Sequence, residues 1–142
     1  MELVPKSPTT VGPAERFTGY VWVDAVAASS PSSPRFGMGL VRFAPGARTA
    51  WHVHAAGQTL HITQGVAIVQ TRDGDTILAG PGETVRTPPG EWHWHGATDD
   101  TFMEHLALSE NLPAADGPTV TWGAHVTDDE YQHALTKGVT HE

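Results

Sequence analysis

Cysteine is absent from this chain of 142 residues. Disulfide bonds and thiolate metal sites are therefore excluded, and any bound metal must be held by histidine nitrogens and oxygen atoms. The lack of cysteine fits a reducing compartment such as the cytoplasm. A chain of this length can bury a core without covalent cross-links, so we expect a single domain.

Positive charge is also scarce. Eight Lys and Arg residues stand against sixteen Asp and Glu residues, and the formal net charge is -8. Because an acidic surface repels phosphate groups, nucleic acid is not an expected partner. No apolar stretch approaches the roughly 18 residues of a membrane-spanning helix, and no basic segment followed by an apolar one marks a signal peptide. We therefore expect a cytoplasmic protein that binds neither membranes nor nucleic acids.

Glycine and proline, by contrast, are frequent: the chain has 15 glycines and 11 prolines, which separate short apolar runs. Runs rich in β-branched and aromatic residues, about 8–12 residues apart, are typical of β-sandwiches and barrels. The predicted fold class is therefore all-β. The expected strands are 19–24, 36–43, 50–54, 59–63, 66–71, 76–79, 84–87, 92–95 and 102–108.

The two ends of the chain depart from this pattern. Residues 1–16 are rich in proline and threonine and are expected to form an extended N-terminal arm, which leaves 17–142 as the single domain. Near the C-terminus, Thr127 can cap a helix over 128–135, with Glu130 at the position of a capping box. The Ser- and Pro-rich segment 27–34 is expected to be a loop.

The predicted strand 36–43 is apolar on both faces. Its alternate residues form two sets, one of which ends in Val41 and Phe43 and the other in Leu40 and Arg42. One face can line the interior of a barrel while the other packs against a second subunit or the arm. We therefore expect the protein to be a homodimer or a homotetramer.

Two pairs of histidines are the most informative residues of the chain. His52 and His54 are separated by one residue, and so are His93 and His95. Residues i and i+2 of a strand project from the same face. Gln58 follows His54 by four residues and offers an amide oxygen. A packing role explains a single histidine more easily than two pairs at matched spacing, so we predict a site for one divalent metal ion.

The spacing resembles the two sequence motifs of the cupin superfamily. The first motif is similar to residues 46–65 and comprises Gly46, His52, His54, Gln58 and Gly65. The second is similar to residues 82–97 and comprises Gly82, Pro88, Gly90, His93 and Ala97. Two positions differ from the family pattern, because Gln58 replaces the usual glutamate and Ala97 replaces the usual asparagine.

This resemblance implies a cupin-type double-stranded β-helix, or jelly-roll barrel, with a metal held by His52, His54, Gln58 and His93. All four are neutral ligands, so a divalent ion keeps its full positive charge and is a stronger Lewis acid. Four protein ligands also leave one or two positions for a substrate. The resemblance favours manganese, with iron next and zinc or nickel as alternatives.

A closer resemblance is to small bacterial cupins that include the manganese-dependent hydroxynitrile lyases. It rests on segments 43–54, 57–60, 87–96, 105–107 and 125–128. It implies that His95 and His105 are catalytic pocket residues and that one of them removes a proton from a cyanohydrin as it is cleaved to an aldehyde and cyanide. From the residues alone, His95 is equally well a base or a structural residue, and parity does not decide which face holds His105.

Two other functions fit the same ligand set. A cupin dioxygenase would act on a small chelating substrate and consume oxygen, whereas a non-catalytic binding or sensor cupin would hold a small molecule without turnover. The other histidines are expected to lie away from the metal, with His61 at the surface or an interface; the rest are His125, His133 and His141.

Three tryptophans flank the histidine pairs along the chain. Strand alternation places them on the face opposite the ligands, where they are expected to pack in the core or at a subunit interface and to stiffen the strands that carry the site. These residues are Trp51, Trp92 and Trp94.

Overall fold

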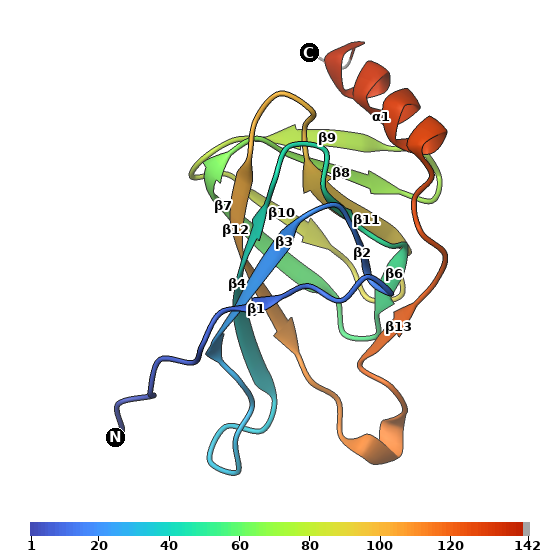
Figure 1. Cartoon of the computed structure of the whole chain (residues 1–142). Helices are drawn as coiled ribbons and strands as arrows, with labels where there is room; N and C mark the ends of the chain where they lie inside the picture. The colour runs from blue at the N-terminus through green and yellow to red at the C-terminus, as the bar shows by residue number, and fades with distance from the viewer. Residues whose placement is uncertain (141–142) are drawn as a thin grey trace.

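The computed structural model describes residues 1–140, which form two curled antiparallel sheets and one C-terminal helix (Figure 1). This architecture confirms the predicted all-β class and the cupin-type barrel. The strands are β1 Thr10–Val11, β2 Phe17–Thr18, β3 Val21–Ala27, β4 Phe36–Phe43, β5 Arg48–Thr49, β6 His52–His54, β7 Gln58–Gly65, β8 Ala67–Thr71, β9 Thr76–Ala79, β10 Thr84–Thr87, β11 His93–Ala97, β12 Met103–Glu110 and β13 Val120–Trp122. The helix α1 is Asp128–Thr140, and Ala114–Asp116 is a short 3-10 turn.

The two sheets form the walls of the barrel. One has the strand order β1-β3-β4-β12-β7-β10. The other has the order β13-β6-β11-β5-β2, with β8 paired to β11 and β9 paired to β8. The paired strands of the described residues are antiparallel, and the chain passes repeatedly from one sheet to the other, as it does from β6 to β7 and from β7 to β8. As a result, segments that are distant in the sequence become neighbours.

The main apolar core fills the space between the sheets. Phe43, Leu60, Ile62 and Met103 are at most 1% exposed and belong to one cluster. Strand β4 behaves as its alternation predicts, because Val41 and Phe43 point into this core. Its opposite face is half-buried or exposed, as expected for a surface that a single barrel does not cover.

Helix α1 covers the outer face of the second sheet with a separate apolar cluster. Trp51 and Trp94 pack there against Val126 and Tyr131 of the helical segment, and Trp92 is partly buried beside them. The three tryptophans therefore pack in an apolar core on the side of the sheet away from the histidines. Of the two predicted positions, core and subunit interface, this is the first. The phenol of Tyr131 donates a 2.7 Å hydrogen bond to the carbonyl of Ala97, which ties the helix to the strand.

The predicted capping box is present at the start of the helix. The amide of Glu130 donates to the hydroxyl of Thr127 at 3.1 Å, and the amide of Thr127 donates to the carboxylate of Glu130 at 3.0 Å. The helix continues to Thr140, beyond the predicted end at residue 135. In this additional turn Gly138 lies against Leu78 of β9. Contact with the sheet therefore stabilises the last residues of the helix, which the sequence pattern did not predict as helical.

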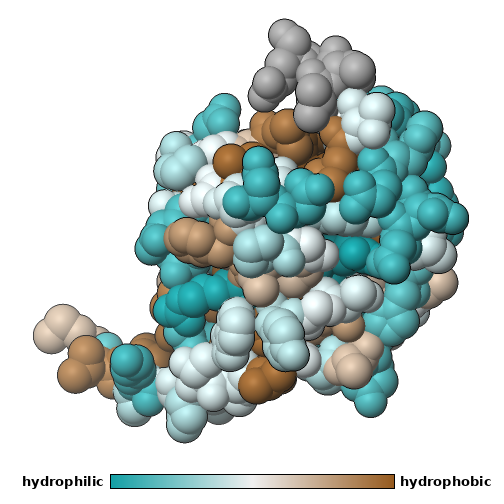
Figure 2. All heavy atoms as spheres, turned by 45° about the horizontal axis from the view of Figure 1, so that its top comes forward, coloured by the Kyte–Doolittle hydropathy of each residue, from teal (hydrophilic) through white to brown (hydrophobic). Residues whose placement is uncertain are grey.

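The N-terminal segment joins the two sheets. Within the predicted arm, Thr10–Val11 pairs with β3, and Phe17–Thr18 then pairs with β5 of the other sheet. The preceding residues extend away from the barrel, where Met1 and Leu3 are exposed (Figures 1 and 2). The division into an arm 1–16 and a domain 17–142 stays a prediction.

Hydrophilic side chains cover much of the face seen in Figure 2. Within residues 1–140, no helix is both long and apolar enough to cross a bilayer. The cytoplasmic location expected from the sequence stays a prediction.

Candidate metal centre

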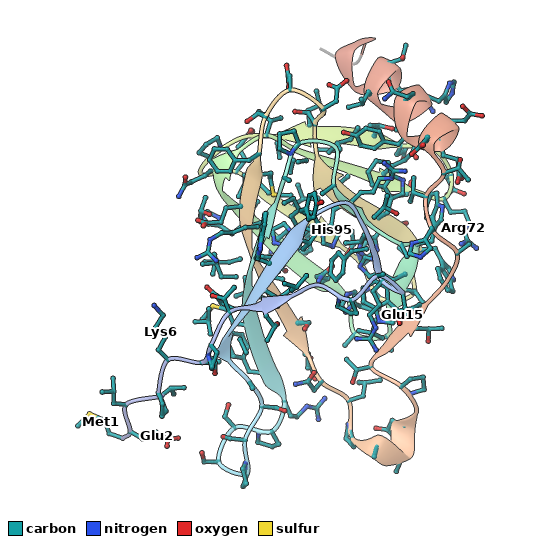
Figure 3. The ribbon with its side chains drawn as sticks, in the orientation of Figure 1. Met1, Glu2, Lys6, Glu15, Arg72 and His95 are labelled. Atoms are coloured by element: carbon teal, nitrogen blue, oxygen red, sulfur yellow. The ribbon has the colours of Figure 1, made fainter. Side chains whose placement is uncertain are left out.

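Five buried imidazoles gather between the two sheets. His52 and His93 are directly opposite each other where β6 pairs with β11, so the fold joins the two histidine pairs of the sequence. His105 comes from β12 of the other sheet. Met103, which shares a strand face with His105, is also fully buried, so this face of β12 points into the barrel. Figure 3 places His95 in the barrel interior. All five side chains are at most 6% exposed; they are His52, His54, His93, His95 and His105.

The tightest group among the described residues is formed by His52, His93 and His95, whose ring nitrogens come within 4.8 Å of one another. The ring of His54 lies 5.3 Å from that of His52 and 5.9 Å from that of His93. The predicted ligand set thus shares two histidines with this group, and its third, His54, lies somewhat farther away. Together the histidines can hold a divalent metal.

Backbone carbonyls fix which nitrogen of His52 and His93 is protonated. Nδ1 of His52 lies 2.9 Å from the carbonyl oxygen of Ala50, and Nδ1 of His93 lies 3.0 Å from that of Glu91. Because a carbonyl only accepts, each Nδ1 donates and the neutral ring keeps an electron pair on Nε2. Such second partners are typical of metal-binding histidines.

Gln58 supplies the oxygen of the predicted set. Its Oε1 lies 3.1 Å from Nε2 of His93, which carries an electron pair rather than a proton. A cation bound to both atoms would offset the repulsion between two acceptors at this distance. The donor set therefore fits a divalent metal, with nitrogen from imidazoles and oxygen from an amide.

Burial keeps these imidazoles neutral. Desolvation, with the neighbouring His93, lowers the pKa of His52 to about 3 and that of His54 to about 4. Burial likewise lowers the pKa of His93, although its hydrogen bond to Glu91 opposes the shift. Neutral rings with free electron pairs are the form that binds metals.

His95 and His105 form a second pair beside the metal-type cluster. Nε2 of His105 lies 3.1 Å from Nδ1 of His95, and Phe43 packs against both rings. Burial lowers the pKa of His105 to about 4 and, with the neighbouring His105, that of His95 well below its ordinary value. Nε2 of His95 is buried and has no hydrogen-bond partner among residues 1–140. His95 thus belongs to the group of His52 and His93, while His105 contacts the Nδ1 edge of its ring.

Sequence reasoning missed one aromatic residue of the site. Trp122 on β13 stacks on His52 with ring centroids 4.6 Å apart and an interplanar angle of 27°. The run Thr119–Trp122 has the β-branched and aromatic character of a strand, which was the available signal. Its pairing with β6, however, is a long-range contact that local pattern does not predict.

The remaining described histidines lie outside the cluster. His61 on β7 is half-buried, and its Nδ1 is 2.9 Å from the hydroxyl of Thr84, which agrees with the predicted surface or interface position. His125 and His133 are exposed. His141, also predicted to be unrelated to the metal, lies outside the described residues.

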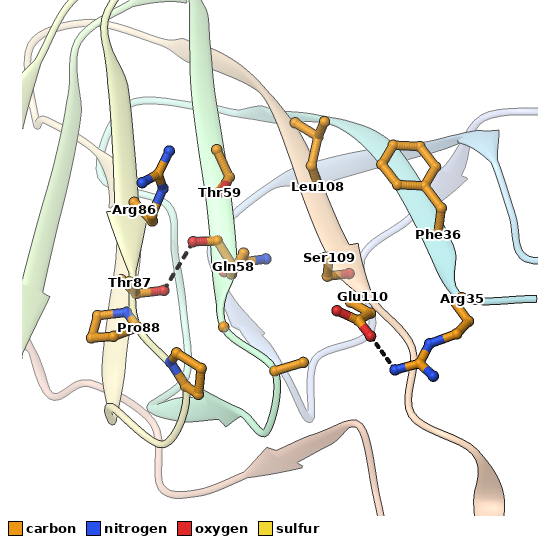
Figure 4. Close-up of a pocket in the computed structure, with 13 residues that line it drawn as sticks. Arg35, Phe36, Gln58, Thr59, Arg86, Thr87, Pro88, Leu108, Ser109 and Glu110 are labelled. Atoms are coloured by element: carbon orange, nitrogen blue, oxygen red, sulfur yellow. Dashed lines mark hydrogen bonds and ion pairs between the residues drawn. The ribbon is translucent and has the colours of Figure 1, made fainter.

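A cleft of about 590 Å³ opens beside the ends of β4, β7, β10 and β12 (Figure 4). Phe36 and Leu108 give it apolar walls, and an ion pair between Arg35 and Glu110 closes one end. Gln58 is one of its lining residues, whereas the five buried histidines are not. The cleft therefore borders the strand that carries Gln58 without opening onto the histidine cluster.

Comparisons with known proteins agree with this geometry. Residues 39–108 match the family described as the cupin domain. An (R)-mandelonitrile lyase from Granulicella tundricola is 46% identical over 121 residues, which cover 85% of this chain and 89% of that protein. A cupin-like protein from Thermotoga maritima is 33% identical, with a TM-score of 0.81 over 94% of this chain and 97% of that one.

More distant structures share the fold alone. A polyketide cyclase from Streptomyces resistomycificus is 19% identical, with a TM-score of 0.63 over 99% of this chain and 96% of its own. Such different activities on one barrel mean that the fold does not fix the reaction. The identity to the lyase and to the Thermotoga protein shows the family: the chain belongs to the cupins, as a small member that resembles the hydroxynitrile lyases.

Proposed function

We propose that this protein is a metal-dependent hydroxynitrile lyase, which cleaves a cyanohydrin to an aldehyde and cyanide or catalyses the reverse addition. The observation that carries the proposal is the neutral cluster of His52, His93 and His95 between the sheets of a chain that is 46% identical to a mandelonitrile lyase. No oxidant is needed for this reaction, since the electron pair of the broken carbon–carbon bond leaves with cyanide.

The proposed metal ligands are His52, His54, Gln58 and His93, and the proposed metal is manganese. When bound, the metal supplies a Lewis acid that stabilises negative charge on a substrate oxygen. The four side chains contribute no negative charge, and buried Nε2 atoms on His52 and His93 are held ready by the carbonyls of the preceding turn. His95 is then left outside the ligand set.

The proposed base is His95, through its unpartnered Nε2. It accepts the hydroxyl proton of the cyanohydrin while the O–H bond breaks, the carbonyl double bond forms and the bond to the nitrile carbon breaks. The protonated ring then returns its proton to the departing cyanide, so that hydrogen cyanide leaves and His95 is neutral again. His105 orients His95 through the 3.1 Å contact between their rings. Phe43 and the surrounding strands exclude water from both rings.

Turnover of mandelonitrile tests this proposal. Protein stripped with a chelator should release little benzaldehyde, and addition of Mn²⁺ should restore the release. His54→Ala should lose the Mn²⁺-dependent activity, whereas His61→Ala, on the outer face, should keep it. If Mn²⁺ restores no benzaldehyde release, the lyase assignment fails. The alternatives would then be a dioxygenase, tested by oxygen consumption with a chelating substrate, and a binding protein, tested by ligand binding without turnover.

We also propose that the protein assembles as a homodimer or homotetramer through the outer face of the six-stranded sheet. Trp22, Val26 and Phe36 on this face are 38–45% exposed, and Leu108 lies beside Phe36 (Figure 4). At its centre Arg42 pairs with both Asp24 and Glu104, which leaves this group of three charges with a net charge of only -1. An apolar face with little net charge at its centre suits a second copy of itself.

Light scattering coupled to gel filtration tests the assembly. A mass of two or four chains is expected, and Leu108→Glu should shift the mass toward one chain because it buries a charge in the apolar contact. A monomeric wild-type protein would rule out this interface.

A further inference from the structure

Trp122 is an aromatic residue of the site that neither the sequence motifs nor the proposed chemistry uses. Strand β13 pairs with β6 so that Trp122 lies directly opposite His52, and both side chains are on the same face of the sheet. Their rings stack at a centroid distance of 4.6 Å with planes 27° apart. Trp122 therefore covers the flat side of a histidine that both the predicted ligand set and the tightest cluster contain.

Polar groups hold the edges of the His52 ring, among them a backbone carbonyl and the side chain of Gln58. Nδ1 donates to the carbonyl of Ala50 at 2.9 Å, and the hydroxyl of Thr49 is more distant at 3.5 Å. Hydrogen bonds at the edges of an imidazole lie near its plane, so contacts with its faces limit how far the ring can tilt. The rings nearest to His52 are those of His93, with centroids 4.4 Å apart, and the indole, which stacks on it at 4.6 Å. The edge contacts and the stacked indole therefore act together to define where Nε2 points.

The indole is itself held by the segment that joins the two sheets. The ring of Phe17 lies 6.2 Å from that of Trp122, and the guanidinium of Arg16 lies over the indole at 5.2 Å. The pairing of β2 with β5 places Phe17 opposite Thr49, and the carbonyl of Arg16 accepts a 2.8 Å hydrogen bond from the amide of Ala50. Trp122 is thus packed between the N-terminal segment and His52 rather than free to turn away.

We propose that Trp122 is a positioning residue for metal binding, which holds the plane of the His52 ring, and that Arg16 and Phe17 hold Trp122 in place. The inference rests on the proposed role of His52 as a metal ligand. An imidazole that donates its electron pair to a cation becomes electron-poor, and the electron-rich face of indole attracts such a ring. The stack should therefore strengthen metal binding and not only the packing of the barrel.

Affinity for Mn²⁺ tests the proposal without any activity assay. Free Mn²⁺ is measured by its electron paramagnetic resonance signal during titration of the protein. Trp122→Leu should weaken binding by about tenfold or more, the loss that is typical when a partner of a metal ligand is removed. Trp122→Phe keeps a stacking ring and should stay within about threefold of wild type. Phe102→Leu, which changes an exposed aromatic residue outside both the site and the proposed subunit interface, is the control and should leave affinity unchanged.

Arg16→Gln provides a second test that does not disturb the core, because Arg16 is exposed. Removing the cation from the indole should weaken Mn²⁺ binding by about twofold to fivefold, the equivalent of one exposed cation–π contact. This result stands even if Trp122→Leu fails to fold.

The outcomes separate this inference from the proposed function. If Trp122→Leu binds Mn²⁺ as tightly as wild type, the positioning role of Trp122 is wrong and the proposed function is unaffected. If Trp122→Leu does not fold, wild-type affinity in Arg16→Gln leads to the same conclusion. A wild-type protein that binds no Mn²⁺ would overturn the proposed manganese site together with this inference. Weak binding in Trp122→Leu that is not rescued in Trp122→Phe would also contradict it, because stacking would not be the cause.

Discussion

The chemistry of individual residues depends on where each imidazole carries its proton. His52 and His93 each use Nδ1 to donate to a carbonyl two residues earlier, which leaves Nε2 free. The resemblance to the two cupin motifs implied that these two residues would meet, and alternation predicted which residues share a face within each strand. It could not predict the protonated nitrogen, since that depends on the direction of carbonyls in the folded backbone.

The roles of His95 and His105 differ in their expected mutational effects. His95→Ala should lower kcat for mandelonitrile cleavage by about a hundredfold or more, the usual contribution of a general base, with Mn²⁺ content unchanged. His105→Ala should cost less, because it contacts the cluster only through His95. Steady-state kinetics and metal analysis of both variants decide this. If His105→Ala lost all activity and His95→Ala kept it, His105 would be the base and His95 the residue that orients it.

Gln58 can be changed to its charged isostere. Gln58→Glu should bind Mn²⁺ more tightly and lower kcat by about tenfold, because an anionic ligand reduces the positive charge available to a substrate oxygen. The comparison needs metal titration and kinetics on the same preparation. Equal or higher activity in the Gln58→Glu variant would show that the neutral ligand set is not important for catalysis.

Among the secondary-structure elements, local pattern predicted the strands whose alternation is strong. Residues 36–43, 76–79 and 84–87 are strands with the predicted bounds. The pattern missed several short strands, among them β1, β2 and β13. These have only two or three residues each and form because the fold brings partner strands beside them. Their formation therefore depends on tertiary contacts that the local sequence pattern does not contain. Trp122 was missed for the same reason.

The C-terminal helix allows stability to be separated from activity. Thr127→Ala removes the hydroxyl that caps the helix and should lower the free energy of unfolding by about 1 kcal/mol. Lyase activity at 25 °C should be unchanged, since the helix packs on the outer face of the sheet, away from the histidines. Urea unfolding and kinetics on one preparation check both statements. A large loss of activity in the folded variant would mean that the helix also positions the site.

For the whole molecule, the buried histidines make stability depend on pH. The folded metal-free protein has pKa values of about 3 for His52 and about 4 for His54 and His105, against an ordinary value of 6.5. Below pH 6.5 the unfolded chain therefore binds more protons than the folded one. The stabilisation is complete above pH 6.5 and is lost as pH falls toward 4 and then 3.

Urea unfolding of the metal-free protein between pH 7.5 and 4.5 measures this effect. The free energy of unfolding should fall with pH by up to about 1.4 kcal/mol per pH unit for each of these three histidines. Mn²⁺ at neutral pH should raise the free energy of unfolding, because it binds the folded state. A free energy that stays constant from pH 7 to pH 5 would contradict burial of neutral imidazoles.

We propose that the buried histidine cluster holds a metal that supports cyanohydrin cleavage without redox change. The most direct test of this proposal records benzaldehyde release and dissolved oxygen in one vessel, with Mn²⁺-loaded protein and mandelonitrile and with His52→Ala as the control. We expect benzaldehyde release without oxygen uptake in the wild type and little release in the variant. Release that consumes oxygen, or equal release by His52→Ala, would contradict the proposal.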